Sequence, residues 1–337
     1  MFTNELIVVA ILWGVGSLVV PRLDRFFALT FTVIASVLCG LRGGGLDYDG
    51  YVSMIDASRA VDGLDVAVVL AVAKDPGFYL VNVLSEFIGQ DYWIVFVLMA
   101  LLGFVPKFMM ADFVGAYRTL FLVFYFFLMA PGLEFAAIRF SVAIAFVGLF
   151  CISGYVKKWI YAFSSFMFHI SMIVLVVAFF GRIRGFIFRN AFFVGFGSFL
   201  FIYIVLGDIS SYFEDRSGSL GAGNIGSIIF PVFNFFWVVV FANSKRITAF
   251  MARDVCFRSV ASLYVYFSLL SMAFSLSFIA ASFRFLEGGL FFGLYAFFVY
   301  GVNRRFDVVV LSCLLSIIFQ LIGFNIVRGT WEALWVI

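Results

Sequence analysis

The residues of this sequence that could do chemistry are charged side chains at the ends of apolar segments. Arg42 ends one apolar segment, Arg139 lies a turn inside a second, and Arg284 separates two more. An uncompensated charge inside a membrane costs at least about 2.5 kcal/mol, so such residues usually line cavities or form ion pairs. Because guanidinium groups bind phosphate oxygens bidentately, the three arginines together predict a lipid-linked phosphate ligand.

Two of these arginines also have acidic neighbours, which offer a purely structural interpretation. Glu134 precedes Arg139 by five residues, a separation that places the two side chains poorly for a contact on one helix face. Glu287 follows Arg284 by three residues, and this spacing suits an ion pair within one helix. The functional and structural interpretations both stay open at these positions.

The stretch LRGGGLDYDGY, residues 41–51, combines groups that are suited to binding a sugar. Three consecutive glycines allow the backbone to approach a ligand closely. Asp47 and Asp49 provide carboxylates, and Tyr48 and Tyr51 provide aromatic faces. The alternative is a solvated loop in which glycine and aspartate simply form turns.

His169 is the only histidine in the chain, and it lies within the unusual segment 157–184. This segment runs from a lysine pair through an apolar stretch to an arginine pair. Since basic residues mark the cytoplasmic side of a membrane, a segment with basic residues at both ends favours a re-entrant hairpin that turns near His169 at mid-bilayer. A neutral imidazole there could accept a proton, although a buried structural histidine is the simpler alternative.

The composition places the chain in a membrane. Hydrophobic residues make up 65% of it, charged residues only 12%, and the mean hydropathy is +1.15. A soluble domain of 337 residues cannot bury that much apolar surface, so we predict an all-α polytopic membrane protein. The net charge of +3 gives no indication of nucleic-acid binding, and the four cysteines have no spacing typical of a disulfide framework or a metal site.

The hydropathy pattern predicts about ten transmembrane helices and two segments that do not cross. The predicted spans lie near residues 5–21, 26–41, 92–110, 113–131, 135–153, 186–206, 225–243, 259–280, 285–301 and 307–326. Segments 66–90 and 157–184 are expected to be re-entrant or interfacial. We therefore expect a single integral membrane domain over residues 1–337, whose outward-facing loops 42–91 and 207–224 contribute to the substrate cavity.

This topology places most of the basic residues on one side of the membrane, as the positive-inside rule requires. The side in question holds 15 of the 22 Lys and Arg residues: Arg22, Arg25, Lys107, Arg118, Lys157, Lys158, Arg182, Arg184, Arg189, Lys245, Arg246, Arg253, Arg258, Arg304 and Arg305. Most acidic residues fall on the other side.

Four blocks of the sequence, taken in order, resemble the EpsG/Wzy-type polysaccharide polymerases. The blocks are LRGGGLDYDGY, DPGFYLVNVLSEFIG, IRFSVAIAF and YVKKWIYAFSSFMFHISMIVL, and together they span residues 41–175. The residues that match the family pattern are Arg42, Gly44, Asp47, Tyr51, Pro76, Gly77, Phe78, Ile138, Arg139, Phe168, His169 and Ser171. Asp75 stands where the family usually has Glu, Phe140 where it has Gln, and the surroundings of Arg284 match only loosely.

The resemblance implies a metal-independent glycosyltransferase of GT-C-like architecture, without a cofactor, in the bacterial cytoplasmic (inner) membrane. Such an enzyme transfers a growing glycan from undecaprenyl diphosphate to the non-reducing end of a new undecaprenyl-diphosphate-linked repeat unit. Its active site faces the periplasm or the outside. The product is an O-antigen, as in lipopolysaccharide biosynthesis, or a related surface glycan. A chain-length regulator and the flippase of the same pathway are expected partners, besides the lipid bilayer.

The resemblance also suggests roles for individual residues. Glycosyl transfer needs a base for the attacking hydroxyl and positive charge near the departing diphosphate. His169 and Asp47 are alternative candidates for the base, and Arg139 is the third expected catalytic residue. The expected substrate-binding residues are Arg42, Arg139, Arg284, Tyr48, Tyr51 and Asp75.

Two other functions would use some of the same residues. A flippase or transporter of the same lipid-linked oligosaccharide would need the arginines but no base, and many transporters show a duplicated half that this sequence lacks. A polysaccharide acyltransferase would use an intramembrane histidine beside a polar partner. The stretch FMFHISMI around His169 offers no such partner, so this alternative ranks last.

Overall fold

The computed structural model describes residues 3–44, 47–60, 75–153, 155–169, 172, 181–206, 226–275, 279–303 and 307–328. All regular structure among these residues is helical. The chain divides into two compact units, of which the first comprises Met1–Leu175 with Arg328–Ile337 and the second Val176–Val327. The prediction of a single membrane domain is left untested by this division.

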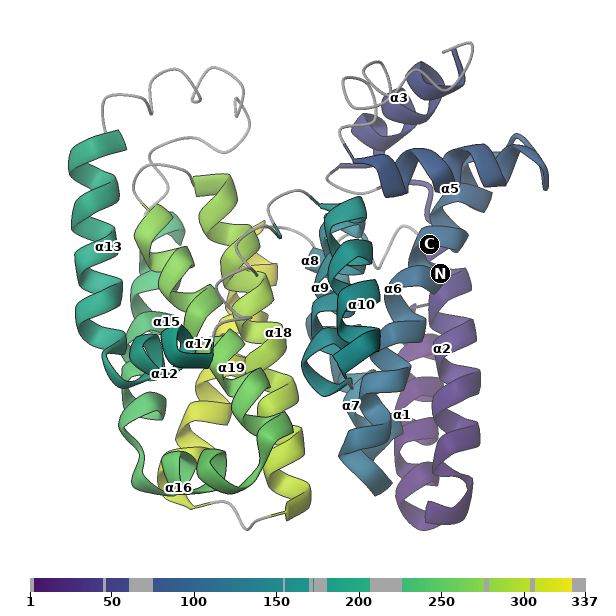
Figure 1. Cartoon of the computed structure of the whole chain (residues 1–337). Coiled ribbons are helices and arrows are strands. Elements are labelled where there is room, and N and C mark those ends of the chain that lie inside the picture. The colour runs from purple at the N-terminus through teal and green to yellow at the C-terminus, as the bar shows by residue number, and fades with distance from the viewer. Residues whose placement is uncertain are drawn as a thin grey trace. The chain divides into compact units, whose positions relative to one another are not determined.

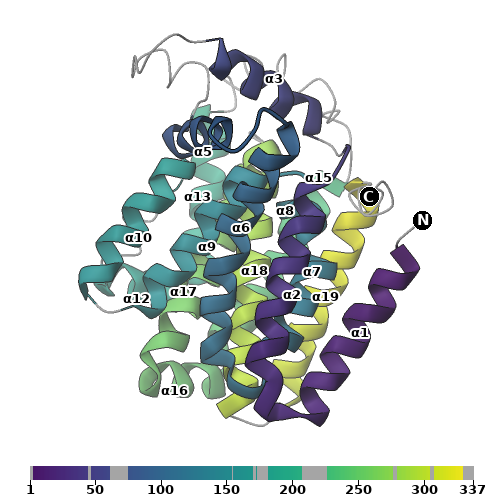
Figure 2. The same cartoon turned by 90° about the vertical axis from the view of Figure 1, so that its right-hand side faces the viewer.

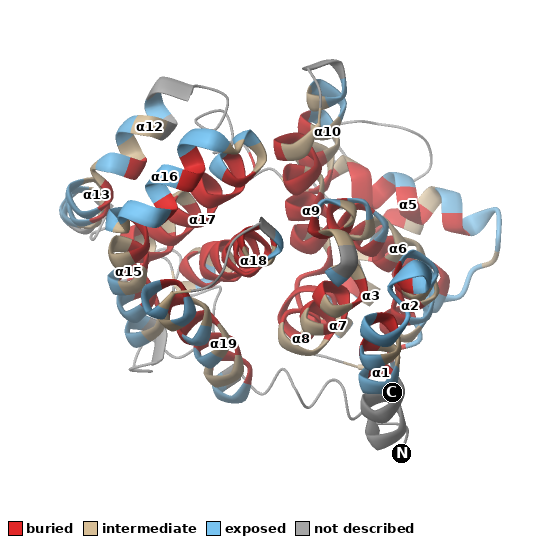
Figure 3. Cartoon of the chain, turned by 90° about the horizontal axis from the view of Figure 1, so that it is seen from below, coloured by how far each residue is buried: buried red, intermediate tan, exposed pale blue. Residues whose placement is uncertain are grey.

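The first unit is a bundle of long helices capped at one end by two shorter ones. Its elements are α1 (Thr3–Val19), η1 (Pro21–Leu23), α2 (Asp24–Gly40), α3 (Tyr48–Arg59), α5 (Pro76–Glu86), α6 (Tyr92–Ala111), η2 (Asp112–Tyr117), α7 (Arg118–Leu128), α8 (Ala130–Leu133), α9 (Ile138–Ile152) and α10 (Tyr155–Phe168). Helices α3 and α5 lie across the end of the bundle where α2 finishes (Figures 1 and 2). Helices α6 and α9 form much of its buried interior (Figure 3).

Glycine allows the closest approach in this bundle, at the end of α2. A Cβ atom on Gly40 would lie 2.1 Å from Cγ2 of Val97 and 2.5 Å from its Cα, so no side chain fits there. Because Gly40 brings α2 directly onto α6, the residue that leaves α2 two positions later, Arg42, emerges against the first turns of α6.

The second unit is built around α17 and α18. Its elements are α12 (Gly181–Arg189), α13 (Ala191–Leu206), α15 (Gly226–Asn243), α16 (Lys245–Arg253), α17 (Val255–Phe274), α18 (Ile279–Asn303) and α19 (Val308–Arg328). Helix α18 is the most buried of its long helices, and α13 and α15 cover α17 (Figure 3). Helix α16 turns by 66° from the end of α15 and buries Ile247, Phe250 and Met251.

Several of the helices are long and apolar enough to cross a membrane, as the hydropathy pattern predicted. Among the described residues, five qualify alone, namely Pro21–Gly40, Tyr92–Gly115, Val255–Phe274, Ile279–Val302 and Val308–Val327. A sixth qualifies if Ile228–Asn243 and the bent Lys245–Arg253 count as one span. The other predicted spans coincide with shorter apolar helices, Ala10–Val19, Arg118–Leu128, Ile138–Ile152 and Ala191–Ile202.

The two segments that we predicted to be re-entrant or interfacial are only partly described. Residues 66–74 lie outside the described residues, and residues 76–86 form α5. Eleven helical residues extend about 16 Å, too little to cross a bilayer core of about 30 Å. In the segment 157–184, α10 runs antiparallel to α9 and ends at Phe168, immediately before the predicted turn. Most of the returning limb lies outside the described residues, so the hairpin stays a prediction. The outer loop 207–224 is likewise not described.

Candidate functional site

Arg42 lies buried in the first unit, with its guanidinium group among aromatic rings. Its side chain follows the end of α2, and the residue is only 3% exposed. Nη1 donates a hydrogen bond of 2.7 Å to the backbone carbonyl of Glu134. The guanidinium carbon lies 4.6 Å from the centre of the Phe96 ring and 5.9 Å from that of Tyr51, distances typical of cation–π contacts.

Arg139, at the beginning of α9, forms an ion pair with Asp75. Nη1 of Arg139 donates to Oδ2 of Asp75 at 2.5 Å, and both side chains are largely buried. The guanidinium carbon lies 5.7 Å from the ring centre of Tyr51 and 5.9 Å from that of Phe78. The structural alternative for Arg139, a pair with Glu134, had an unfavourable spacing, and in the structure the carboxylate of Asp75 pairs with the arginine.

Two guanidinium groups, those of Arg42 and Arg139, therefore lie within about 6 Å of the centre of the Tyr51 ring, which connects residues of two separate sequence blocks. We call the cluster of Arg42, Tyr51, Asp75, Phe78, Phe96 and Arg139 the two-arginine site. It contains two guanidinium groups and one carboxylate, so its formal charge is positive. Charges inside a protein interact more strongly than in water, so an anionic group would be attracted to this cluster.

Asp75 reaches Arg139 because of the backbone at the start of α5. A proline restricts the residue before it to extended conformations, and Asp75 has φ −132° and ψ 122°. Pro76 then starts the helix, where its missing N–H costs nothing. The sequence Asp-Pro-Gly thus places a carboxylate just outside the first turn of α5.

Gly77 allows this turn to pack on the end of α10, next to His169. A Cβ atom at Gly77 would lie 2.8 Å from the carbonyl oxygen of Met167, so only glycine permits the contact without a shift. The His169 ring packs edge-on against Phe140, with 5.4 Å between the ring centres. Since Phe140 directly follows Arg139, the structure brings the predicted histidine to the beginning of the helix that carries this arginine. At position 140, where the motif resembled by IRFSVAIAF usually has Gln, Phe140 instead makes a ring contact with His169.

The tyrosines and Asp47 of the first block lie around Arg42. Tyr48 stacks on Phe96 with 5.2 Å between the ring centres, and Tyr51 is buried. Burial lowers the pKa of the Arg42 guanidinium from its ordinary value, while Tyr51, Cys39, Glu134 and Asp47 act in the opposite direction. The carboxylate of Asp47 is therefore near enough to act on Arg42 electrostatically. Asp49 is exposed in the first turn of α3.

Behind the two-arginine site lies a buried ion pair that the sequence did not reveal. Lys107 and Glu134 are both fully buried, with 2.8 Å between Nζ and Oε1. Lys107 also donates to the Ser141 hydroxyl at 2.8 Å and to the Gly103 carbonyl at 3.1 Å. The Tyr125 hydroxyl donates to the same Glu134 oxygen at 2.7 Å. Lys107, which the predicted topology counts among the basic residues of one membrane side, therefore lies inside the helix bundle.

This ion pair supports the two-arginine site through Glu134. The carboxylate of Glu134 accepts hydrogen bonds from Lys107, Tyr125 and Ser141, while its backbone carbonyl accepts one from Arg42. Because Glu134 lies in the short link between α8 and α9, these bonds also hold the chain that leads into Arg139. In the sequence, the only sign of this pair was one charged residue inside each of two apolar runs, Lys107 and Glu134. Arg139 is nearer to Glu134 in sequence, so the pairing with Lys107 could not be recognised.

Arg284 lies in the second unit, within α18. Its Nη1 lies 3.2 Å from Oε2 of Glu287, so the ion pair that the i,i+3 spacing suggested does form. Glu287 is almost fully buried, whereas the Arg284 side chain is 25% exposed. A role for Arg284 in substrate binding stays a prediction.

Among the residues that the structure describes, no group of three or more His, Cys, Asp or Glu side chains could hold a metal ion. None of the four cysteines, all of which lie among the described residues, forms a disulfide bond.

Comparison with known proteins identifies one family. The sequence model of the EpsG family matches residues 25–334, nearly the whole chain. No curated protein and no solved structure matches the chain. The match extends well beyond the four blocks of residues 41–175 and includes the second unit.

Proposed function

Because the chain belongs to the EpsG family, a Wzy-type polymerase-like family, we propose that it polymerises lipid-linked repeat units of a surface polysaccharide. The growing glycan is transferred from undecaprenyl diphosphate to the non-reducing end of a new undecaprenyl-diphosphate-linked repeat unit, without a metal ion. The product is O-antigen or a related glycan. The observation that carries the proposal is the two-arginine site.

The hydrogen bonding of Arg42 supports a diphosphate ligand, because two nitrogen atoms of its guanidinium group lack an acceptor among the described residues. Nε and Nη2 are buried and have no hydrogen-bond partner among the described residues, whereas Nη1 is bound to Glu134. A buried donor without a partner costs about 1–3 kcal/mol, and more when it is charged. Phosphate oxygens would satisfy both donors in the bidentate geometry that guanidinium groups favour.

Arg139 also lies beside Tyr51 and would contact the same ligand. Its ion pair with Asp75 keeps the guanidinium group oriented, while 16% of the side chain remains exposed. We assign Asp75 a positioning role, because it contacts the arginine. The two cations would stabilise the negative charge that develops on the departing diphosphate.

The reaction requires a proton acceptor, and two candidates lie near the arginines. The acceptor hydroxyl oxygen forms the new bond to the anomeric carbon while the carbon–oxygen bond to the diphosphate breaks. The diphosphate leaves with the electron pair, and the hydroxyl proton passes to the base. His169 lies beside Phe140, next to Arg139, and Asp47 lies near Arg42. Both remain candidates for this role.

We propose that ten helices cross the bacterial inner membrane, with the two-arginine site facing the periplasm. Five long apolar helices, the bent pair and four shorter apolar helices support the count of ten. The excess of Lys and Arg away from the predicted outer loops supports the orientation. The GT-C-like architecture belongs to the same proposal and rests on the family resemblance.

The test is an assay of the full-length protein in detergent with an undecaprenyl-diphosphate-linked oligosaccharide repeat unit. We expect a ladder of products at repeat-unit spacing without added metal or nucleotide sugar. Arg42→Gln and Arg139→Gln should each lower the rate by at least about 100-fold, the usual effect of removing one preorganised donor at a developing negative charge.

Arg59 provides a matched control. It is also a partly buried arginine beside an aromatic ring, 5.4 Å from the centre of Tyr92, and it lies outside the two-arginine site. Arg59→Gln should keep most of the activity. Equal losses in all three variants would show that the arginines act on stability, and the proposed role of the two-arginine site would be wrong.

A flippase for the same lipid is the alternative function, because a cationic site could serve transport as well. Proteoliposomes that move the labelled lipid across the bilayer, together with the absence of a ladder from the cognate repeat unit, would favour it. Under that alternative, His169→Ala and Asp47→Ala should both retain normal transport, since transport needs no base.

A further inference from the structure

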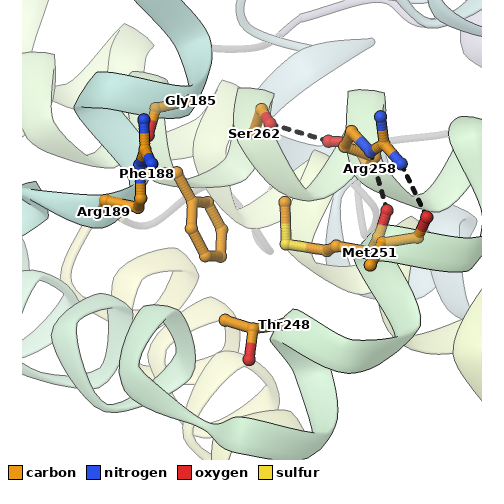
Figure 4. Close-up of a pocket in the computed structure, with 8 residues that line it drawn as sticks. Gly185, Phe188, Arg189, Thr248, Met251, Arg258 and Ser262 are labelled. Atoms are coloured by element: carbon orange, nitrogen blue, oxygen red, sulfur yellow. Dashed lines mark hydrogen bonds between the residues drawn. The ribbon is translucent and has the colours of Figure 1, made fainter.

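The second unit contains a cavity of about 280 Å³ that has no part in the proposed reaction. It lies between α12, α16 and α17, and its lining residues are Gly185, Phe188, Arg189, Thr248, Met251, Ala252, Arg258 and Ser262 (Figure 4). The lining is mainly apolar, with two arginines among it.

The two arginines stand on different helices at opposite edges of the cavity (Figure 4). Arg258, on α17, donates from Nε and Nη2 to the carbonyls of Met251 and Ala252, which closes the C-terminal end of α16. Arg189, on α12, donates from Nε to the carbonyl of Gly185. Each guanidinium group therefore keeps outer donors that make no hydrogen bond to the described residues.

Between the arginines, the floor of the cavity is apolar. Phe188 and Met251 are buried, 6% and 8% exposed, and Figure 4 shows both side chains pointing into the space between the arginines. A ligand that fits this arrangement has an anionic group at the rim and a hydrocarbon portion beside it.

The segments that form the cavity are rich in basic residues in sequence. Segments 181–189 and 245–258 contain seven basic residues, namely Arg182, Arg184, Arg189, Lys245, Arg246, Arg253 and Arg258. Their one acidic residue, Asp254, accepts a hydrogen bond from the Phe257 N–H and so caps α17. Helix α16 is a short basic amphipathic helix at an angle to α15, the type that lies at a membrane interface. Basic pockets at that level bind the head groups of acidic lipids.

We propose that the cavity between α12, α16 and α17 binds an anionic membrane phospholipid. Arg189 and Arg258 contact its phosphate, and Phe188 and Met251 contact the first part of one acyl chain. This site lies wholly within the second unit, so the proposal is independent of the reaction proposed above.

The experiment measures lipid binding to the full-length protein by native mass spectrometry. Phosphatidylglycerol and phosphatidylcholine are each titrated into the detergent-solubilised protein. We expect one phosphatidylglycerol to bind well before further lipids add, and phosphatidylcholine to bind only weakly. Equal affinity for the two lipids would overturn the proposal. Inorganic phosphate at millimolar concentration should not displace the lipid; displacement would show a site for free anions instead.

Two variants test the place of binding, each with a matched control. Arg189→Gln should weaken phosphatidylglycerol binding about tenfold, as expected for losing one charge-assisted contact. The control Lys157→Gln also removes one positive charge, but from an exposed site in the first unit, so it should leave the affinity unchanged. Arg258 is left intact because it also caps α16.

Gly185→Leu tests the cavity itself without removing a charge. A Cβ atom at Gly185 meets nothing within 4 Å, so a leucine fits there without a clash and would occupy the cavity. Gly197 on α13 is equally open and lies outside the cavity, which makes Gly197→Leu the control. We expect Gly185→Leu to abolish the first binding event and Gly197→Leu to keep it. Unchanged binding in Gly185→Leu would refute the assignment of the site.

Discussion

Replacing Lys107 with methionine should destabilise the first unit, although no part of the change touches solvent. Lys107 and Glu134 are both fully buried and bonded to each other at 2.8 Å. Methionine has a similar length but no charge, so Lys107→Met leaves the Glu134 carboxylate as an uncompensated charge in an apolar interior.

The magnitude follows from the contacts that remain. Breaking a buried ion pair by removing one partner costs about 3–5 kcal/mol. In Lys107→Met, Glu134 still accepts hydrogen bonds from Tyr125 at 2.7 Å and Ser141 at 2.6 Å, so we expect the lower limit, about 3 kcal/mol. For a chain of this size, about 2 °C is lost per kcal/mol, which gives a fall of about 6 °C in the melting temperature.

The double variant Lys107→Met/Glu134→Gln removes the stranded charge as well. It should therefore recover about 2 kcal/mol of the loss, so the two substitutions are strongly non-additive. Thermal unfolding in detergent, followed by tryptophan fluorescence, measures Lys107→Met, Glu134→Gln and the double variant. Lys157→Met, at an exposed position of α10, is the control and should melt with the wild type.

Two results would refute this reasoning. One is a Lys107→Met variant as stable as the wild type, which would mean that the buried pair contributes nothing. The other is a double variant whose loss equals the sum of the single losses, which would mean that Lys107 and Glu134 act independently.

Three further predictions concern the site directly. Asp75→Asn removes the ion pair with the arginine of α9 and should reduce polymerisation at least about tenfold, whereas Asp75→Glu should keep most of it; equal losses would contradict the positioning role. One of the variants His169→Gln and Asp47→Asn should slow polymerisation at least about 100-fold while substrate still binds, and that variant identifies the base. Near-normal rates in both variants would show that neither residue is the base. Gly103→Ala places a Cβ atom 2.9 Å from a buried carboxylate oxygen, so it should lower stability by about 1–3 kcal/mol, measurable as a lower melting temperature; an unchanged melting temperature would show that the interior yields there.

The course of the chain through its helices could be predicted well. Each of the ten apolar runs overlaps a helix among the described residues. An apolar run of sufficient length is a local property, and in a membrane it must form a helix to satisfy its own backbone. Among the described residues, five helices, or six with the bent pair, are long and apolar enough to span, and the other predicted spans coincide with shorter apolar helices.

The residues of the site could be named, but their partners could not. Arg42, Tyr51, Asp75 and Arg139 were all expected to bind substrate. The structure places both arginines beside the Tyr51 ring and Asp75 against Arg139. The partner of Arg139 is nevertheless Asp75, 64 residues away in sequence. Glu134, which is nearer to Arg139 in sequence, forms its ion pair with Lys107. No local spacing in the sequence predicts that pairing.

The sequence by itself determined that this is a helical membrane protein of the EpsG family, and which charged residues stand at the edges of its helices. These properties follow from the apolar composition and from motifs that are short and contiguous. Only the tertiary structure decided which charges meet. Gly40 brings α2 onto α6, and Gly77 brings α5 onto α10. Pairing between distant segments depends on how closely the helices pack, and that distance is set by contacts from the whole unit.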